Sequence, residues 1–92
     1  KFGETPFLTG EQAAEHFQVF PNPSNGQFVV LAQGLNVPLT FTVTDLAGKV
    51  VHTQGNVQGE RYEVQLGDQA AGMYLLQVEG KNVRYTKRVV VQ

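Results

Sequence analysis

This sequence has two histidines, which could act as bases near neutral pH, and a single serine, which could act as a nucleophile. A catalytic site needs such a group beside an orienting partner. His52 lies in a segment of strand type, and His16 ends a stretch that contains scattered glycines and glutamates. Ser24 lies in a Pro-Ser-Asn-Gly sequence, which predicts a turn rather than the strained elbow of a catalytic serine. We therefore predict no catalytic residue and no enzymatic activity.

The acidic residues are dispersed along the chain and predict no metal site. None of the eight carboxylates repeats at the alternating spacing of a calcium-binding loop. The chain has no cysteine, so it has no disulfide, thiolate or cysteine-bound zinc, and cysteine usage leaves the redox compartment open. We predict no metal ion and no cofactor, and we interpret Asp45 as a turn former.

The three tyrosines have a functional and a structural interpretation. Tyr62, Tyr74 and Tyr85 could form an aromatic platform for carbohydrate, but two of them fall on the apolar register of their strands. This favours packing in the core. Tyr74 follows Gly72 by two residues at the start of a strand, which fits a tyrosine corner whose hydroxyl bonds to backbone upstream.

The charged residues argue against several classes of partner. The basic pair Lys87 and Arg88 is, by itself, a solvated pair or a guard of an edge strand against aggregation. A formal net charge of -1 gives no field that would gather nucleic acid or an anionic membrane surface. No apolar run approaches the roughly 20 residues needed to cross a bilayer. We predict no nucleic-acid partner and no direct membrane insertion.

These side chains must be positioned by one small domain. A chain of 92 residues with 41% hydrophobic content can build a single core and is too short for two. Residues 1–16 show no sustained period of two, which predicts a linker, and residues 17–92 form the domain. Because the chain opens with Lys1 rather than methionine, we expect it to be a fragment of a larger protein.

A short helix is expected inside the linker. The spacing favours a helical turn over residues 11–15, but so short a helix is marginal alone. It would form only if the side that carries Ala13, Ala14 and Phe17 packed onto the body of the domain.

From residue 17 onward, the chain has the pattern of a β-sandwich. Short segments rich in Val, Phe, Thr and Tyr are separated by turn residues at roughly ten-residue spacing. Apolar residues alternate with polar ones, as where Leu39, Phe41 and Val43 alternate with three threonines that should face water. We predict an all-β, seven-stranded immunoglobulin-like antiparallel β-sandwich with Greek-key topology. Its strands are expected at residues 17–20, 27–33, 39–45, 50–54, 61–66, 73–79 and 83–92.

Proline and glycine mark the turns between these strands. Pro21 and Pro23 lack an amide donor and cannot lie inside a paired central strand. The Asn-Gly pair ending at Gly26 supplies the positive φ of a tight turn. Asp45 and Gly48 take the first and fourth places of a type I turn, which closes a hairpin.

Four segments, taken in order, resemble the type A C-terminal sorting domain of the type IX secretion system. They are Pro21-Asn22-Pro23-Ser24-Asn25-Gly26, Asp45-Leu46-Ala47-Gly48-Lys49-Val50, Ala71-Gly72-Met73-Tyr74-Leu75-Leu76-Gln77-Val78 and Lys87-Arg88-Val89-Val90-Val91. The resemblance covers residues 17–92, and the ordered set is more specific than any one segment. Gln69 departs from the leucine that such domains commonly have five residues before the corner tyrosine, which weakens the packing argument for the corner.

The resemblance implies a sorting label on a larger protein exported by a Gram-negative bacterium of the Bacteroidetes kind. The cargo would pass through the periplasm to the outer membrane, the cell surface or the medium. The implied partners are the outer-membrane secretion machinery and a separate sortase-like cysteine peptidase, which would remove the label within residues 1–16. The implied motif residues are Pro21, Asn22, Pro23, Gly26, Asp45, Gly48, Gly72 and Tyr74, and the expected recognition residues are Lys87, Arg88, Val89, Val90 and Val91.

Two rival functions remain open at this point, together with the oligomeric state. A carbohydrate-binding or fibronectin-like accessory module of a secreted enzyme would have the same fold, so the fold alone does not separate the two. Such a module would need exposed aromatic side chains in a row. A structural spacer would tolerate loss of the last strand without any effect on export.

Overall fold

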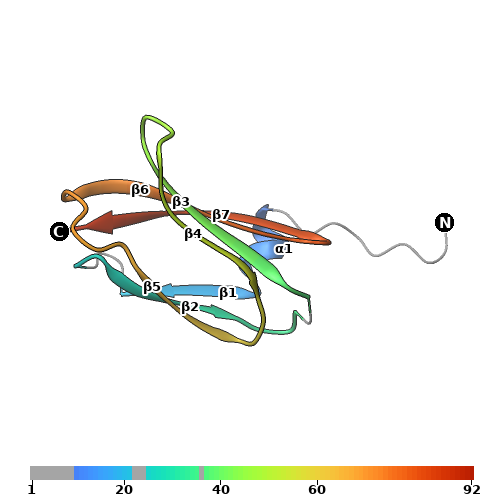
Figure 1. Ribbon diagram of the computed structural model, residues 1–92. Coiled ribbons are helices and arrows are strands. Elements are labelled where there is room, and N and C mark those ends of the chain that lie inside the picture. Colours follow the sequence, from blue (N-terminus) through green and yellow to red (C-terminus); the bar gives the residue numbers. More distant parts are fainter. Residues whose placement is uncertain (1–9, 22–24, 36) are drawn as a thin grey trace, which may run out of the picture.

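Two antiparallel sheets form the body of the protein (Figure 1). The computed structural model describes residues 10–21, 25–35 and 37–92, and this part of the chain contains seven strands. One sheet has the order β1-β2-β5, with β1 at Phe17–Phe20, β2 at Gln27–Ala32 and β5 at Arg61–Gln65. The other has the order β4-β3-β6-β7, with β3 at Leu39–Asp45, β4 at Val50–Val57, β6 at Gly72–Gly80 and β7 at Val83–Val91. The predicted seven-stranded antiparallel sandwich is confirmed.

The order of the strands shows how the chain crosses between the sheets. It passes from one sheet to the other between β2 and β3, returns between β4 and β5, and crosses again between β5 and β6. Strands that follow each other in sequence are therefore often not neighbours in a sheet, as in a Greek key. As predicted, Pro21 comes immediately after β1 and stays outside the paired strands.

Residue alternation determines which side chains enter the core. In β3, Leu39, Phe41 and Val43 are buried as expected, whereas Thr40 is exposed. Thr42 and Thr44 are only half-buried, because β4 and β6 flank them on the outer face of the four-stranded sheet, the side away from β1, β2 and β5.

Two aromatic pairs connect the sheets through the core. The rings of Phe17 in β1 and Tyr85 in β7 stack with their centroids 4.7 Å apart. Phe41 in β3 and Tyr62 in β5 meet edge to face, also at 4.7 Å. Such contacts add about 0.5–1.5 kcal/mol to the burial of the rings. They place β1 over β7 and β5 over β3.

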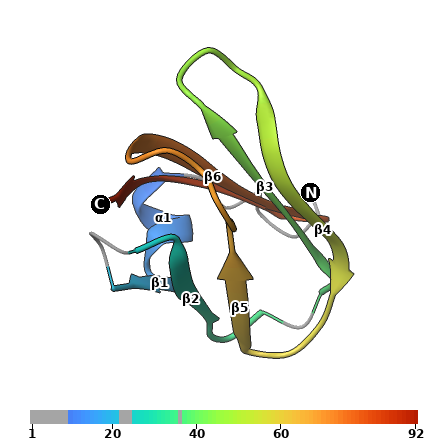
Figure 2. The ribbon, with the colours of Figure 1, turned by 60° about the vertical axis from the view of Figure 1, so that its left-hand side comes forward.

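The expected short helix is present as α1, at Gly10–Ala14. Ala13 is fully buried, and α1 contacts both β7 and β1 at one side of the sandwich (Figure 2). Phe17 is also buried, but Ala14 is exposed, so only part of the predicted apolar side packs. The helix therefore packs with the sandwich although it lies within the predicted linker, of which residues 1–9 lie outside the described residues. Within the described ranges, no helix is long and apolar enough to span a bilayer.

Two strands, β1 and β3, have the predicted ends, and the others differ from the prediction by one to three residues at one or both ends. The largest difference is in β4, which continues to Val57 instead of residue 54. Val57 pairs with Leu39, the first residue of β3, after an irregularity in the ladder. β4 is therefore extended by pairing with the whole length of β3, which the local sequence of β4 does not reveal. The other differences are single residues: β2, β5 and β7 end one residue earlier than predicted, and β6 is one residue longer at each end because Gly72 and Gly80 both pair with β7.

Candidate functional site

The loop between β1 and β2 contains the proline-rich motif. Pro21 follows a cis peptide bond and is exposed, whereas Gly26 is buried with a φ of +102°. The carbonyl of Gly26 accepts a hydrogen bond of 2.8 Å from the amide of Leu66, just after β5. A side chain would be strained at this φ, which explains a glycine here. Asn22, Pro23 and Ser24 lie outside the described residues.

The hairpin turn between β3 and β4 has the predicted geometry. One carboxylate oxygen of Asp45, Oδ1, accepts hydrogen bonds of 2.9 Å from the amides of Ala47 and Lys49. The amide of Gly48 donates to the carbonyl of Asp45, and Gly48 has a φ of +92°. Asp45 is therefore a turn former, because its carboxylate replaces solvent for two backbone donors.

Tyr74 forms the predicted tyrosine corner. Its ring is 6% exposed, and its hydroxyl donates a hydrogen bond of 2.5 Å to the carbonyl of Ala70, four residues upstream. Gly72 lies between these two residues and begins β6. The bond ties the chain that crosses from β5 to the start of β6, and it forms although Gln69 stands where the resemblance leads one to expect a leucine.

Replacing Tyr74 by phenylalanine should lower the free energy of unfolding by about 1–2 kcal/mol, because the change leaves a partly buried carbonyl without its donor. Urea denaturation followed by circular dichroism would measure this loss. Tyr62→Phe is the matched comparison, since the Tyr62 hydroxyl donates an equally short bond to the carbonyl of Gly59. A change near zero for both variants would show that these bonds do not stabilise the corners.

The last strand presents the basic pair at the surface. Lys87 and Arg88 are both exposed and point to opposite faces of β7. Val89 and Val91 are buried, with 1% and 5% of their surface exposed, whereas Val90 is half-buried on the outer face. Of the five expected recognition residues, Lys87, Arg88 and Val90 are thus the ones that a partner could contact directly.

The candidate bases have structural hydrogen bonds. The Nδ1–H of His16 donates to the carbonyl of Gln33 at 2.7 Å, and Nε2 of His52 lies 2.7 Å from Oε1 of Gln54. Among the residues with a described position, no three histidine or acidic side chains are grouped so that they could hold a metal ion. Each histidine therefore has a hydrogen-bond partner within the fold, while the candidate nucleophile Ser24 lies outside the described residues.

All three tyrosines belong to the core. Each is at most 9% exposed, so Tyr62, Tyr74 and Tyr85 form no exposed carbohydrate platform. Burial raises the pKa of Tyr62 above its ordinary value, with a smaller contribution from the carboxylate of Glu60. Burial also raises the pKa of Tyr85. The bond from Tyr62 to Gly59 was not anticipated, although a tyrosine three residues after a glycine could have suggested it.

Three exposed apolar side chains were also missed by the sequence analysis. Leu46, Val50 and Met73 expose 68%, 54% and 39% of their surface. Leu46 and Val50 flank the turn of the hairpin, and Met73 lies on the outer face of β6. The exposure of Met73 could have been predicted from the sequence. The alternation in β6 buries Tyr74, Leu76 and Val78, so Met73 must point to the outer face.

The described residues thus make a folded module of the immunoglobulin-like class, with corners fixed by hydrogen bonds and its distinctive side chains at the surface. A DUF3244 family protein from Bacteroides vulgatus has the same immunoglobulin-like β-sandwich fold, with a TM-score of 0.71, 20% identity and 84% coverage of each chain. Residues 18–92 match the family described as the secretion system C-terminal sorting domain, and the chain belongs to this family. No similar sequence was found among curated proteins.

Membership of this family confirms the resemblance to the sorting domains of the type IX secretion system. The domain is a sorting signal that engages the secretion machinery and directs export to the outer membrane, the cell surface or the medium. Its family and fold indicate a non-catalytic module.

Proposed function

We propose that this domain carries a larger cargo protein from the periplasm through the outer-membrane machinery, and that the machinery reads the domain while it is folded. The observation behind this proposal is the exposure of Lys87 and Arg88 on opposite faces of one strand at the edge of a rigid sandwich. Exposed charged side chains on a folded strand give a partner a fixed pattern of charge to recognise. Val89 and Val91 contribute by anchoring β7 in the core.

Replacing Lys87 and Arg88 together by alanine should leave the fold intact and retain a reporter fusion in the periplasm. Both side chains are exposed, so their loss removes charge from the surface without opening the core. The double variant Lys81→Ala, Arg84→Ala is the matched control, because it removes the same charge near the opposite end of β7. Fractionation of cells that carry a type IX secretion system measures the distribution of reporter. Equal export of both double variants would reject a role for the basic pair.

A second part of the proposal concerns removal of the domain. A separate sortase-like cysteine peptidase cleaves within residues 1–16, and the cargo is then joined to anionic lipopolysaccharide or released. The packing of α1 narrows the expected position of the cleavage site within residues 1–16, because cleavage after Gly10 would require displacement of the buried Ala13 and Phe17.

The new end of the exported cargo is therefore expected before Gly10. Mass spectrometry of cargo recovered from the cell surface or the medium would locate this end. An end within residues 28–91 would contradict the proposed processing, since it would require cleavage inside the folded sandwich.

A further inference from the structure

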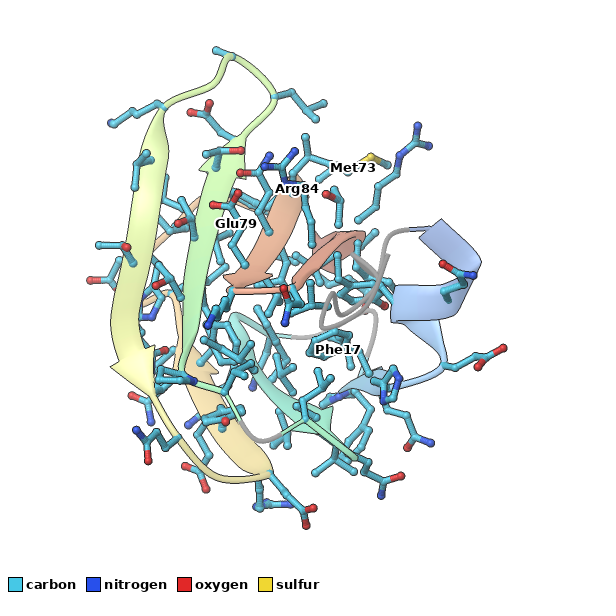
Figure 3. The ribbon with its side chains drawn as sticks, turned by 90° about the vertical axis from the view of Figure 1, so that its right-hand side faces the viewer. Phe17, Met73, Glu79 and Arg84 are labelled. Carbon is cyan, nitrogen blue, oxygen red and sulfur yellow. The ribbon has the colours of Figure 1, made fainter. Side chains whose placement is uncertain are left out.

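The outer face of the four-stranded sheet has a polar end and an apolar end. At the polar end, Glu79 and Arg84 form an ion pair of 3.2 Å across β6 and β7. At the other end are Leu46, Val50 and Met73, three of the four large hydrophobic side chains that are exposed in the described part of the chain. Figure 3 shows Met73 on the same side of the sheet as Glu79 and Arg84, with Phe17 on the inner side.

The register of the strands brings the apolar side chains together. Thr44 lies opposite both Val50 in β4 and Leu75 in β6, and Met73 lies opposite Val90 in β7. Directly opposite residues in antiparallel strands point to the same face. These residues therefore share one face of the sheet, with the half-buried Thr44 between Val50 and Leu75, and Leu46 extends this area onto the hairpin turn. We call this area the hairpin patch; it consists of Leu46, Val50, Met73, Leu75 and Val90.

The position of the hairpin patch makes it accessible to a large partner. The hairpin of β3 and β4 projects beyond the rest of the sandwich (Figures 1 and 2). The helix α1 packs at a different place, between β1 and β7, and does not cover the hairpin. A group of exposed apolar side chains on one face is typical of a protein interaction site.

The charges around the hairpin patch define the kind of partner. Lys49 is exposed beside Val50, and Arg88 is exposed opposite Leu75. Asp45, whose Oδ1 accepts two amide hydrogen bonds within the turn, adds one carboxylate beside these two cationic side chains. In a twofold contact between two copies, the patch would meet itself and bring these cations toward each other. Carboxylates around an apolar centre would complement it better.

We propose that the hairpin patch is the docking surface for a protein of the secretion machinery that presents an apolar area bordered by acidic residues. This inference rests on the sorting function and specifies the surface that performs it. Arg88 and Val90 connect the patch to β7, so the recognised surface extends from the last strand across β6 to the hairpin.

The test uses the whole chain fused to a fluorescent reporter in a Gram-negative host with a type IX secretion system. Met73→Glu should reduce the reporter at the cell surface by about tenfold, the effect of losing one central contact of an interface. Gln77→Glu is the matched control, because Gln77 is exposed on the same face of the same strand, outside the patch. Leu46→Glu provides a second variant at a site 68% exposed, and Lys49→Glu tests the charge.

Each outcome separates the docking surface from the sorting function. Reduced export of Met73→Glu, Leu46→Glu and Lys49→Glu, with normal export of Gln77→Glu and unchanged thermal unfolding, supports the inference. Normal export of Met73→Glu and Leu46→Glu overturns it and leaves the sorting function standing. Failure of the unmodified fusion to reach the surface overturns both. Sedimentation of the unmodified chain tests for a dimer. If the chain forms a dimer that Met73→Glu abolishes, the patch binds a second copy of the chain, and the assigned partner is overturned.

Discussion

Replacing Phe41 by alanine is expected to bring the domain close to unfolding at ordinary temperatures. Phe41 is fully buried in β3 and meets Tyr62 of the other sheet at 4.7 Å. Truncation of such a side chain costs about 3–5 kcal/mol, because it removes buried apolar surface and leaves a cavity. The whole stability of a domain is only about 5–15 kcal/mol. The melting temperature should therefore fall by at least about 12 °C.

The matched control for this change lies in the adjoining turn of the same hairpin. Leu46 is 68% exposed, and Leu46→Ala should change the free energy of unfolding by less than about 0.5 kcal/mol. Calorimetry and urea denaturation of both variants would measure the difference. A similar loss of stability in both would contradict the assignment of Phe41 to the core between the two sheets.

Replacing Ala13 by glutamate is expected to detach α1 from the sandwich. Ala13 is fully buried against β7 and β1, where a carboxylate would be desolvated and crowded. A helix of five residues does not persist without its contacts. The free energy of unfolding should fall by about 1–3 kcal/mol, and residues 10–16 should become open to proteolysis while the strands remain protected.

Ala14→Glu makes the same chemical change one residue later, at an exposed position of α1. It should leave stability within about 0.5 kcal/mol of the unmodified chain. Limited proteolysis with mass spectrometry, together with urea denaturation, compares the two variants. If they behave alike, α1 is not held by the burial of Ala13.

The fold could largely be predicted from the sequence because one face of each main strand is buried. A shift of one residue would turn Leu39, Phe41 and Val43 to solvent, so the alternation determines the register strongly. The turn at Asp45 and the corner at Tyr74 could also be predicted from the sequence, since each depends on a few neighbouring residues. Both motifs have the hydrogen bonds expected from the sequence.

Features that depend on distant residues could not be predicted. The hairpin patch combines residues from three strands and a turn, and only the pairing of β3 with β4 and β6, and of β6 with β7, brings them together. Packing of α1 depends on the space between β1 and β7, which the local sequence does not describe. For the same reason, the sequence predicts both Lys87 and Val89 as recognition residues, although Lys87 is exposed and Val89 is buried.

The two sheets have unequal numbers of strands, and β4 has no counterpart in the smaller one. With β5 over β3 and β1 over β7, none of the described side chains in β4 is buried. Val51 and Val57 still pack against the core from β4, but substitutions at its other described positions should cost little folding energy, and relatives should vary more there than in β3. Lineages could then adapt this hairpin to their own export apparatus while the rest of the molecule keeps its shape.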